Sequence, residues 1–169
     1  MPKIKKNIVD IKTSATLAIN ELSQKLKDRG QEIYKFGLGQ SPFPVPQIIV
    51  EELKKNAQQK NYINVSGLIE LRNLVAQYHT IKNKNNYTAD NVIIGPGSKE
   101  LIFHTQLVLD CDVLLPSPSW VSYEPQAQIL NKKIHWIKTD ATTNWHITPD
   151  DLDKISQDLH QVEKLLILN

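Results

Sequence analysis

The chain has a single cysteine, Cys111, among its 169 residues. One cysteine allows neither an internal disulfide nor a cluster of thiolate metal ligands, and it suits a reducing compartment. We therefore expect a cytoplasmic location. The sequence also lacks an apolar run of signal-peptide length near its start, and it has no run long enough to cross a bilayer. We expect no interaction with a membrane.

An excess of one charge is also missing. The 20 Lys and Arg residues nearly balance the 18 Asp and Glu residues, which leaves a formal net charge of +2. The lysines are scattered instead of forming a stripe, so nucleic acid is a poor candidate partner. Arginine occurs only as Arg29 and Arg72, which we expect on helix surfaces. The histidines show no zinc-binding spacing, and no Gly-x-Ser-x-Gly motif is present.

What the chain does contain is an alternation of helix-like and strand-like segments. Apolar residues at helical spacing predict helices that begin near Ser14, Pro46, Leu68, Ser98 and Thr148, with an interrupted helix over residues 120–130. Short apolar or alternating runs predict strands over residues 92–94, 112–118, 133–138 and 164–169. This order predicts an α/β fold of three layers, α/β/α, in which parallel strand pairs are favoured.

The last predicted helix and strand carry further information. Thr148 is expected as the N-cap, Pro149 as the first helical residue and Asp151 as the third, with an apolar stripe that continues to Val162. The strand "KLLILN" then ends the sequence. A buried parallel strand is usually covered by a following helix. We therefore expect the chain to be cut short.

The stretch "NVIIGPGSKELIFH", residues 91–104, runs from a predicted strand through two glycines into a predicted helix. Such a turn gathers backbone N–H groups at the positive end of a helix dipole, where anions bind. Gly97 would allow close approach, Ser98 would add a hydroxyl and Lys99 a positive charge. A plain tight turn with Ser98 as N-cap explains the same residues. Neither the dinucleotide nor the nucleoside-triphosphate motif is complete.

Five stretches together resemble the N-terminal part of the class I and II, aspartate-aminotransferase-like enzymes of fold type I. In chain order they are "FGLGQSPFPVP", "YINVSGLIELR", "GPGSKELIF", "LPSPSWVSYEP" and "KLLILN". Their order and spacing agree with the family pattern from Phe36 to Asn169. These enzymes depend on pyridoxal 5'-phosphate.

The resemblance implies roles for individual residues. Gly97, Ser98 and Lys99 would hold the cofactor phosphate, and Trp120 would stack on the pyridine ring. Each of the remaining site residues also has an ordinary structural explanation. Gly39 would let the main chain approach the substrate carboxylate, or it is a turn glycine. Tyr62 would reach the phosphate of a neighbouring subunit and so implies a homodimer, or it is a half-buried loop tyrosine. A core tryptophan is the alternative for Trp120.

The resemblance also implies an organisation and an activity. Residues 1–40 would be a helical part of the small domain, and residues 41–169 the first half of the cofactor-binding large domain. The reaction would pass an amino group from an amino acid to a 2-oxo acid. A lyase or decarboxylase of the same superfamily would share the cofactor site. Two further alternatives are a non-catalytic interaction module derived from such an enzyme and an unrelated α/β domain that binds a phosphorylated ligand.

The chain has no residue that matches the family's catalytic groups. The lysine that bonds to the cofactor, the carboxylate at the pyridine nitrogen and the arginine that binds the substrate carboxylate would all follow residue 169. We therefore predict no aminotransferase activity for residues 1–169 alone. Incubation with an amino acid, a 2-oxo acid and pyridoxal 5'-phosphate tests this, and steady turnover would contradict it.

Overall fold

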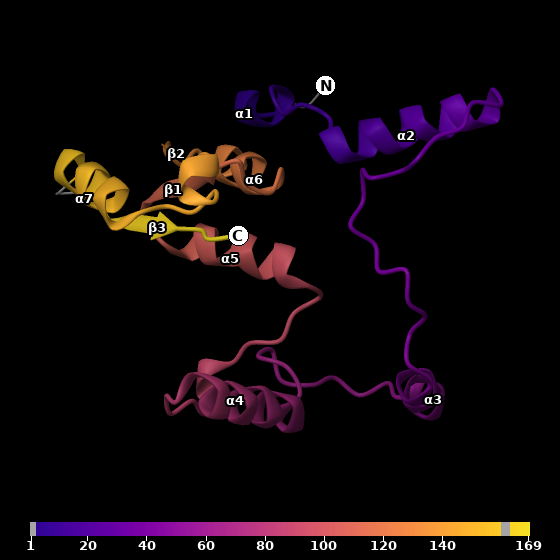
Figure 1. Ribbon diagram of the computed structural model, residues 1–169. Helices are drawn as coiled ribbons and strands as arrows, with labels where there is room; N and C mark the ends of the chain where they lie inside the picture. Colours follow the sequence, from indigo (N-terminus) through magenta and orange to yellow (C-terminus); the bar gives the residue numbers. More distant parts are fainter. Residues whose placement is uncertain (1–2, 160–162) are drawn as a thin grey trace. The chain divides into compact units, whose positions relative to one another are not determined.

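The computed structural model describes residues 3–159 and 163–169. The elements are shown in Figure 1. The helices are α1 (Lys6–Val9), α2 (Ala15–Asp28), α3 (Gln47–Asn56), α4 (Ile69–Asn83), α5 (Ser98–Val108), α6 (Tyr123–Ile129) and α7 (Pro149–Asp158). The strands are β1 (Asp112–Ser117), β2 (Ile134–Lys138) and β3 (Lys164–Leu166), and short 3-10 turns occur at η1 (Ala89–Asn91) and η2 (Ala141–Thr143). Val162, which the sequence places on the last helical stripe, lies outside the described residues.

The chain forms two compact units. Unit 1 consists of Met1–Leu38 and Ile102–Asn169, and unit 2 of Gly39–Leu101. The predicted domain boundary near residue 40 concerns the domains of a complete enzyme and stays a prediction. Within the described residues, no helix has both the length and the apolar character that a membrane span requires.

Unit 1 contains a parallel sheet with the strand order β2-β1-β3. Leu114 of β1 lies beside His135 of β2 on one edge and Leu166 of β3 on the other. A central parallel strand is covered on both faces, and β1 is accordingly buried from Val113 to Pro116. The prediction of an α/β fold with parallel strands is confirmed.

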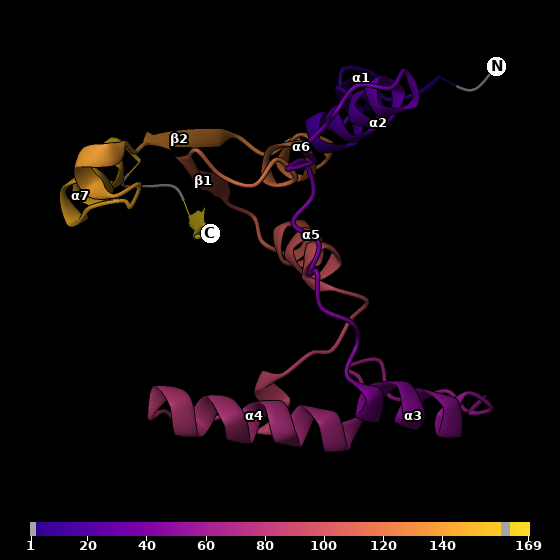
Figure 2. The ribbon, with the colours of Figure 1, turned by 45° about the vertical axis from the view of Figure 1, so that its right-hand side comes forward.

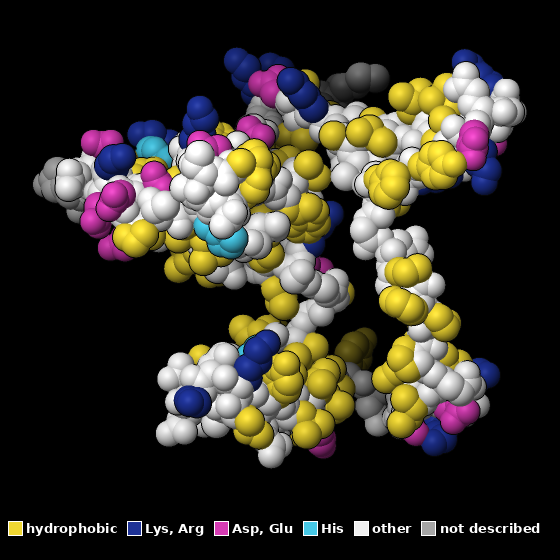
Figure 3. All heavy atoms as spheres, viewed as in Figure 1, with side chains coloured by type: hydrophobic (Ala, Val, Ile, Leu, Met, Phe, Trp, Pro, Cys, Tyr) yellow, Lys and Arg dark blue, Asp and Glu magenta, His cyan; other side chains and the backbone are white. Residues whose placement is uncertain are grey.

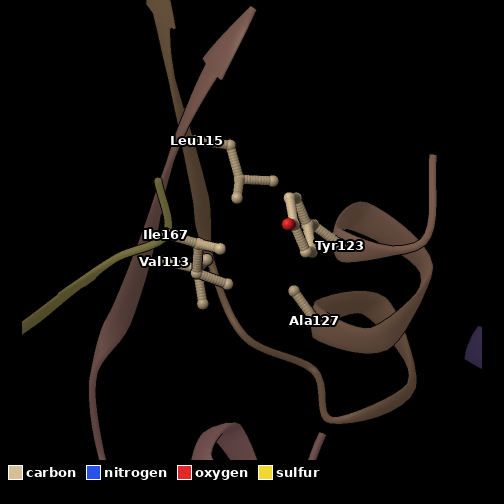
Figure 4. Packing of buried hydrophobic residues seen from close by; sticks show 5 residues of the cluster. All are labelled: Val113, Leu115, Tyr123, Ala127 and Ile167. Atoms are coloured by element: carbon tan, nitrogen blue, oxygen red, sulfur yellow. The ribbon is translucent and has the colours of Figure 1, made fainter. Parts of the chain in front are cut away.

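Helix α6 covers one face of this sheet. Tyr123 and Ala127 of α6 point at Val113 and Leu115 of β1, with Ile167 beside them (Figure 4). Val113 and Leu115 are two residues apart, so they share a face because side chains alternate along a strand. Both are fully buried, with 0% of their surface exposed. This cluster is the described core of unit 1.

Helix α7 lies at the other face. Leu152 of α7 lines a cavity of about 440 Å³ together with Pro116 and Leu166, whose positions alternate with those of the α6 face. Helices therefore lie on both faces of the sheet, as the α/β/α prediction requires.

Unit 2 is built around α4, which Figure 2 shows along its length. The helical spacing of Leu68, Leu71, Val75 and Tyr78 predicts this helix. In the structure α4 buries Arg72 and Ala76, and Leu68, Leu71 and Tyr78 are exposed. The predicted helix is present, and its buried face packs toward η1 and the segment that follows it.

The strand predicted at residues 92–94 is not a strand in the structure. Val92 has extended backbone angles, but the segment is unpaired with the described sheet. Its polar groups bond elsewhere, since the Ile94 N–H donates to the Ser66 carbonyl at 2.9 Å. The apolar pattern predicted the extended backbone but not its partner.

Apolar side chains remain exposed on several helices (Figure 3). On α3 the side chains of Ile48, Ile49 and Leu53 are 56–70% exposed. The ion pair on this helix joins Lys55 to Glu52 at 2.6 Å, while Glu51 accepts a hydrogen bond from Gln47. Lys55 therefore pairs with Glu52, three positions before it, and not with Glu51, whose partner is Gln47.

The N-terminus of α7 has the predicted capping box. The Thr148 hydroxyl donates to Oδ2 of Asp151 at 2.6 Å, and the Asp151 N–H donates back to that hydroxyl at 3.3 Å. The Thr148 backbone N–H also donates to Oδ2 of Asp151, at 3.0 Å. The bonds that the Asp151 carboxylate accepts from the hydroxyl and the backbone of Thr148 hold its pKa below the ordinary value of 3.8. A carboxylate with a lowered pKa stabilises the fold above its unfolded-state pKa and loses this effect as the pH falls through the folded-state pKa.

We predict that Asp151→Ala lowers the free energy of unfolding at pH 7, because α7 loses its cap. The difference from wild type should shrink as the pH falls below about 3.8, where the carboxylate becomes protonated. Urea titrations at several pH values measure the free energy of unfolding of both proteins and so this difference. Asp153→Ala, on the exposed side of the same helix, is the control, and an equal loss in both variants would contradict the prediction.

Candidate functional site

The turn that the sequence singled out leads directly into α5, and the turn and the first residues of this helix, up to Leu101, belong to unit 2. Gly97 has a φ of +99°, and a Cβ built on it would meet nothing within 4 Å. Glycine adopts this backbone angle without strain, whereas residues with a Cβ rarely do. The Gly97 N–H donates to the carbonyl of Gly95 at 2.7 Å, which closes the turn just before Ser98, the first residue of α5. The open side of Gly97 leaves room for a ligand.

The start of α5 has the features of an anion site. The first backbone N–H groups of a helix have no carbonyl one turn earlier, and the helix dipole adds positive potential there. Gly97, Ser98 and Lys99 are exposed, so their polar groups are accessible to solvent. Gly95 has a different reason to be glycine, because a Cβ there would lie 2.8 Å from the Leu101 side chain. This arrangement fits a phosphate group.

The segment before the turn is held by α4 and by the loop that precedes it. Arg72 is only 8% exposed, so its predicted place on a helix surface is wrong. Its Nε donates to the carbonyls of Ala89 at 3.1 Å and Val92 at 2.9 Å, and Nη2 donates to Ala89 at 2.6 Å. Arg72 shares its helix face with the buried Ala76, four residues further on, but an alanine at this spacing gave little signal in the sequence.

Gly67 completes this support. It has a φ of +101°, and a Cβ on it would lie 2.6 Å from the Cβ of Ile94. Its N–H donates to the Asn64 carbonyl at 2.8 Å and so closes a turn, and the close approach of Ile94 is a second reason for glycine here. The Ser66 carbonyl next to it accepts the Ile94 N–H.

Trp120 lies in unit 1, just beyond the carboxyl end of β1. In open α/β sheets, ligands bind outside the carboxyl ends of the strands. The indole is 36% exposed and meets the Tyr123 ring edge to face, with centroids 5.3 Å apart. It lines a cavity of about 530 Å³ together with Trp136 and the residues Asp10–Ala15. An aromatic surface is thus accessible beside a cavity.

The N-terminal segment in this cavity is a feature that the sequence analysis missed. Asn7 anchors α1, because its side-chain amide donates to the carbonyls of Gln128 at 3.2 Å and Ile129 at 2.8 Å. Those carbonyls lie at the C-terminal end of α6, where helix carbonyls lack partners within the helix. A polar residue in a short N-terminal helix gave no signal of this long-range contact.

The predicted site residues fall in both units. Gly39, Tyr62, Gly97, Ser98 and Lys99 belong to unit 2, and Trp120 belongs to unit 1. Tyr62 is fully exposed, so the half-buried loop tyrosine considered as its alternative is wrong. Gly39 has nothing within 4 Å of an added Cβ. That the indole faces the Gly97 turn stays a prediction.

Among the described residues, no group of three or more His, Cys, Asp and Glu side chains is placed to hold a metal ion.

A comparison with known families now bears on this site. Residues 31–169 match the family described as aminotransferase class I and II. The chain belongs to this aminotransferase family. The predicted resemblance is therefore confirmed, and an unrelated phosphate-binding α/β domain is not favoured.

Individual relatives agree with the assignment. The chain is 27% identical over 153 residues to a probable aspartate/prephenate aminotransferase of Rhizobium leguminosarum bv. phaseoli, covering 85% of this chain and 37% of that protein. It is 28% identical over 155 residues to an aspartate aminotransferase of Bacillus subtilis strain 168, covering 89% and 39%. The chain thus spans about two fifths of the length of the aminotransferases that it matches.

Solved structures show the same fold. The aspartate aminotransferase from Rhizobium meliloti superposes with a TM-score of 0.82 at 23% identity, over 91% of this chain and 40% of that one. The aspartate aminotransferase from Thermotoga maritima gives a TM-score of 0.79 at 24% identity, over 90% and 42%. The fold is that of fold-type I aminotransferases.

We predict that Gly67→Ala destabilises this part of the aminotransferase fold. A Cβ at Gly67 clashes with Ile94, and a non-glycine residue at such a φ costs about 1–3 kcal/mol. Chemical denaturation followed by circular dichroism measures the loss. Gly39→Ala is the matched control, because its Cβ enters open space. Equal stability of the two variants would contradict the prediction, because it would show that the residues around Gly67 move to accommodate a Cβ.

Proposed function

We propose that the chain is part of a pyridoxal 5'-phosphate-dependent aminotransferase, which transfers an amino group between an amino acid and a 2-oxo acid. The support is membership of the aminotransferase class I and II family over residues 31–169. The glycine turn at the start of α5 is the structural observation that carries the proposal. Its open side, exposed amides and adjacent lysine suit the phosphate of the cofactor.

The proposed role of the turn is to bind the cofactor at its phosphate. The main-chain amides at Ser98 and Lys99 would donate to the phosphate oxygens, with further donors from the Ser98 hydroxyl and the Lys99 ammonium. Gly97, whose own N–H is bonded to the Gly95 carbonyl, would let the phosphate approach closely. When bound, the cofactor supplies an electron sink for the carbon from which the amino group leaves. Fixing the phosphate would orient the pyridine ring for that chemistry.

Trp120 and Gly39 would act on other parts of the reacting molecules. The exposed indole of Trp120 offers a flat apolar surface on which the pyridine ring would stack. Gly39 has no side chain and open space beside it, so its backbone could approach a substrate carboxylate. Both roles are binding and orientation, and none of the residues named here is proposed to move a proton.

The complete enzyme is proposed to be a homodimer. Tyr62 is fully exposed, as expected for a side chain that reaches into a neighbouring subunit. Val65, three residues further along, is 99% exposed, which adds apolar surface to the same loop. Residues 1–40 would belong to the small domain and residues 41–169 to the large domain. The cytoplasmic location stays a prediction from the sequence.

Fluorescence tests the cofactor proposal directly. In a Trp136→Phe/Trp145→Phe variant, Trp120 is the only tryptophan that remains. Pyridoxal 5'-phosphate should quench its emission saturably, whereas ribose 5-phosphate should not, because only the former carries an aromatic ring. Lys99→Met should weaken the binding about tenfold, since a hydrogen bond to a charged group is lost. Lys54→Met on α3 is the control.

Two results would contradict the proposal. Equal effects of pyridoxal 5'-phosphate and ribose 5-phosphate would indicate a general phosphate site without ring stacking. Binding that is unchanged in Lys99→Met would place the phosphate elsewhere.

A further inference from the structure

The buried guanidinium of Arg72 joins α4 to the segment that leads into the Gly97 turn. It donates three hydrogen bonds to two backbone carbonyls, those of Ala89 and Val92. It also forms an ion pair with Asp90, at 3.6 Å from Nη2 to Oδ1, but the Asp90 side chain is 96% exposed. Such an exposed partner contributes little. The carbonyl contacts are therefore the main interactions of this side chain.

A buried arginine needs a reason, because moving a charge out of water is costly unless its donors are satisfied. Arg72 meets this condition by bonding to a backbone that otherwise lacks a sheet partner. A single planar guanidinium presents several N–H groups in a fixed fork, so it can hold two carbonyls three residues apart in the chain. A lysine ammonium has no such fork.

The anchored segment is fixed at a second point on its other side. The Ile94 N–H donates to the Ser66 carbonyl at 2.9 Å, and Gly67 lies directly against Ile94. Residues 92 and 94 are thus both tied to the start of α4, from a side chain and from the preceding loop. Gly97 follows Ile94 by three residues, so little chain separates these ties from the turn.

We infer that Arg72 is a positioning residue for the phosphate turn. By holding the carbonyls of Ala89 and Val92, it fixes the direction in which the chain enters Gly95–Gly97 and so orients the amides at the start of α5. This inference rests on the proposed function for its ligand, the cofactor phosphate. The ties themselves lie entirely within unit 2 and need no ligand.

The test compares Arg72→Lys and Arg72→Met with wild type in two measurements. Without ligand, hydrogen exchange of the bonded amides of Ile94 and Gly97 should become about tenfold faster relative to those in the middle of α4, because opening of this segment becomes easier. In the Trp120 fluorescence assay, pyridoxal 5'-phosphate should bind about tenfold more weakly, whereas phosphate-free pyridoxal should bind as in wild type. A general loss of stability would weaken the binding of both ligands to the same extent.

Two controls isolate the carbonyl contacts. Asp90→Asn removes the exposed ion pair but keeps the three hydrogen bonds to Ala89 and Val92, and it should behave as wild type in both assays. Arg29→Lys makes the same chemical change at an exposed position after α2. Arg72→Lys keeps the charge and most of the volume, so it serves if Arg72→Met does not fold.

The outcomes separate this inference from the proposed function. If wild type does not bind pyridoxal 5'-phosphate, the proposed function fails, and the exchange rates alone decide whether Arg72 positions the turn. If wild type binds and the Arg72 variants match it in affinity and exchange, the inference is wrong and the proposed function stands. Faster hydrogen exchange over the whole of unit 2 would contradict the inference, because it would show that Arg72 stabilises the unit in general and does not position the turn.

Discussion

Every buried or extended stretch of backbone must find partners for its polar groups, and this constraint shapes unit 2. The extended residues Val92–Ile94 lie outside the described sheet, so Arg72 and Ser66 supply the partners that a neighbouring strand would give. The glycine at position 67 allows Ile94 to come close enough for this bonding. The backbone that leads into the turn at Gly97 is therefore held in place by α4. Its direction decides the orientation of the amides in the turn.

Unit 1 satisfies its backbone in the usual way for a parallel sheet, with β1 paired on both edges and covered on both faces. Trp120 follows directly from the carboxyl end of this buried strand. The strand is buried and paired on both edges, and Asn7 holds the N-terminal segment that lines the same cavity as the indole. An aromatic surface and an anion site thus rest on two different supports, a sheet and a helix.

The proposed function gives these two features a common purpose. A cofactor with a phosphate at one end and a flat heteroaromatic ring at the other needs an anion site and an aromatic surface. The chain spans about two fifths of the aminotransferases that it matches, and its proposed contribution is to bind and orient. Exposed apolar residues lie on α3 and on the loop with Tyr62, and such surfaces would face further protein in the proposed homodimer.

The sequence alone determined what depends on local interactions and repeated patterns. The α/β order, the parallel strands, the capping box at Thr148 and the glycine turn all follow from spacing and turn chemistry within a few residues. Motif order also identified the family, since five modest motifs in sequence are specific together. Only the tertiary structure decided which partners distant groups choose. Arg72 reads as a surface residue until its carbonyl partners, 17 and 20 residues away, are seen, and the segment at Val92 reads as a strand until its neighbours are known. The burial of a residue and the partners of its hydrogen bonds depend on segments that are distant in the chain. The periodicity of apolar residues reports only on neighbours within one helix or strand.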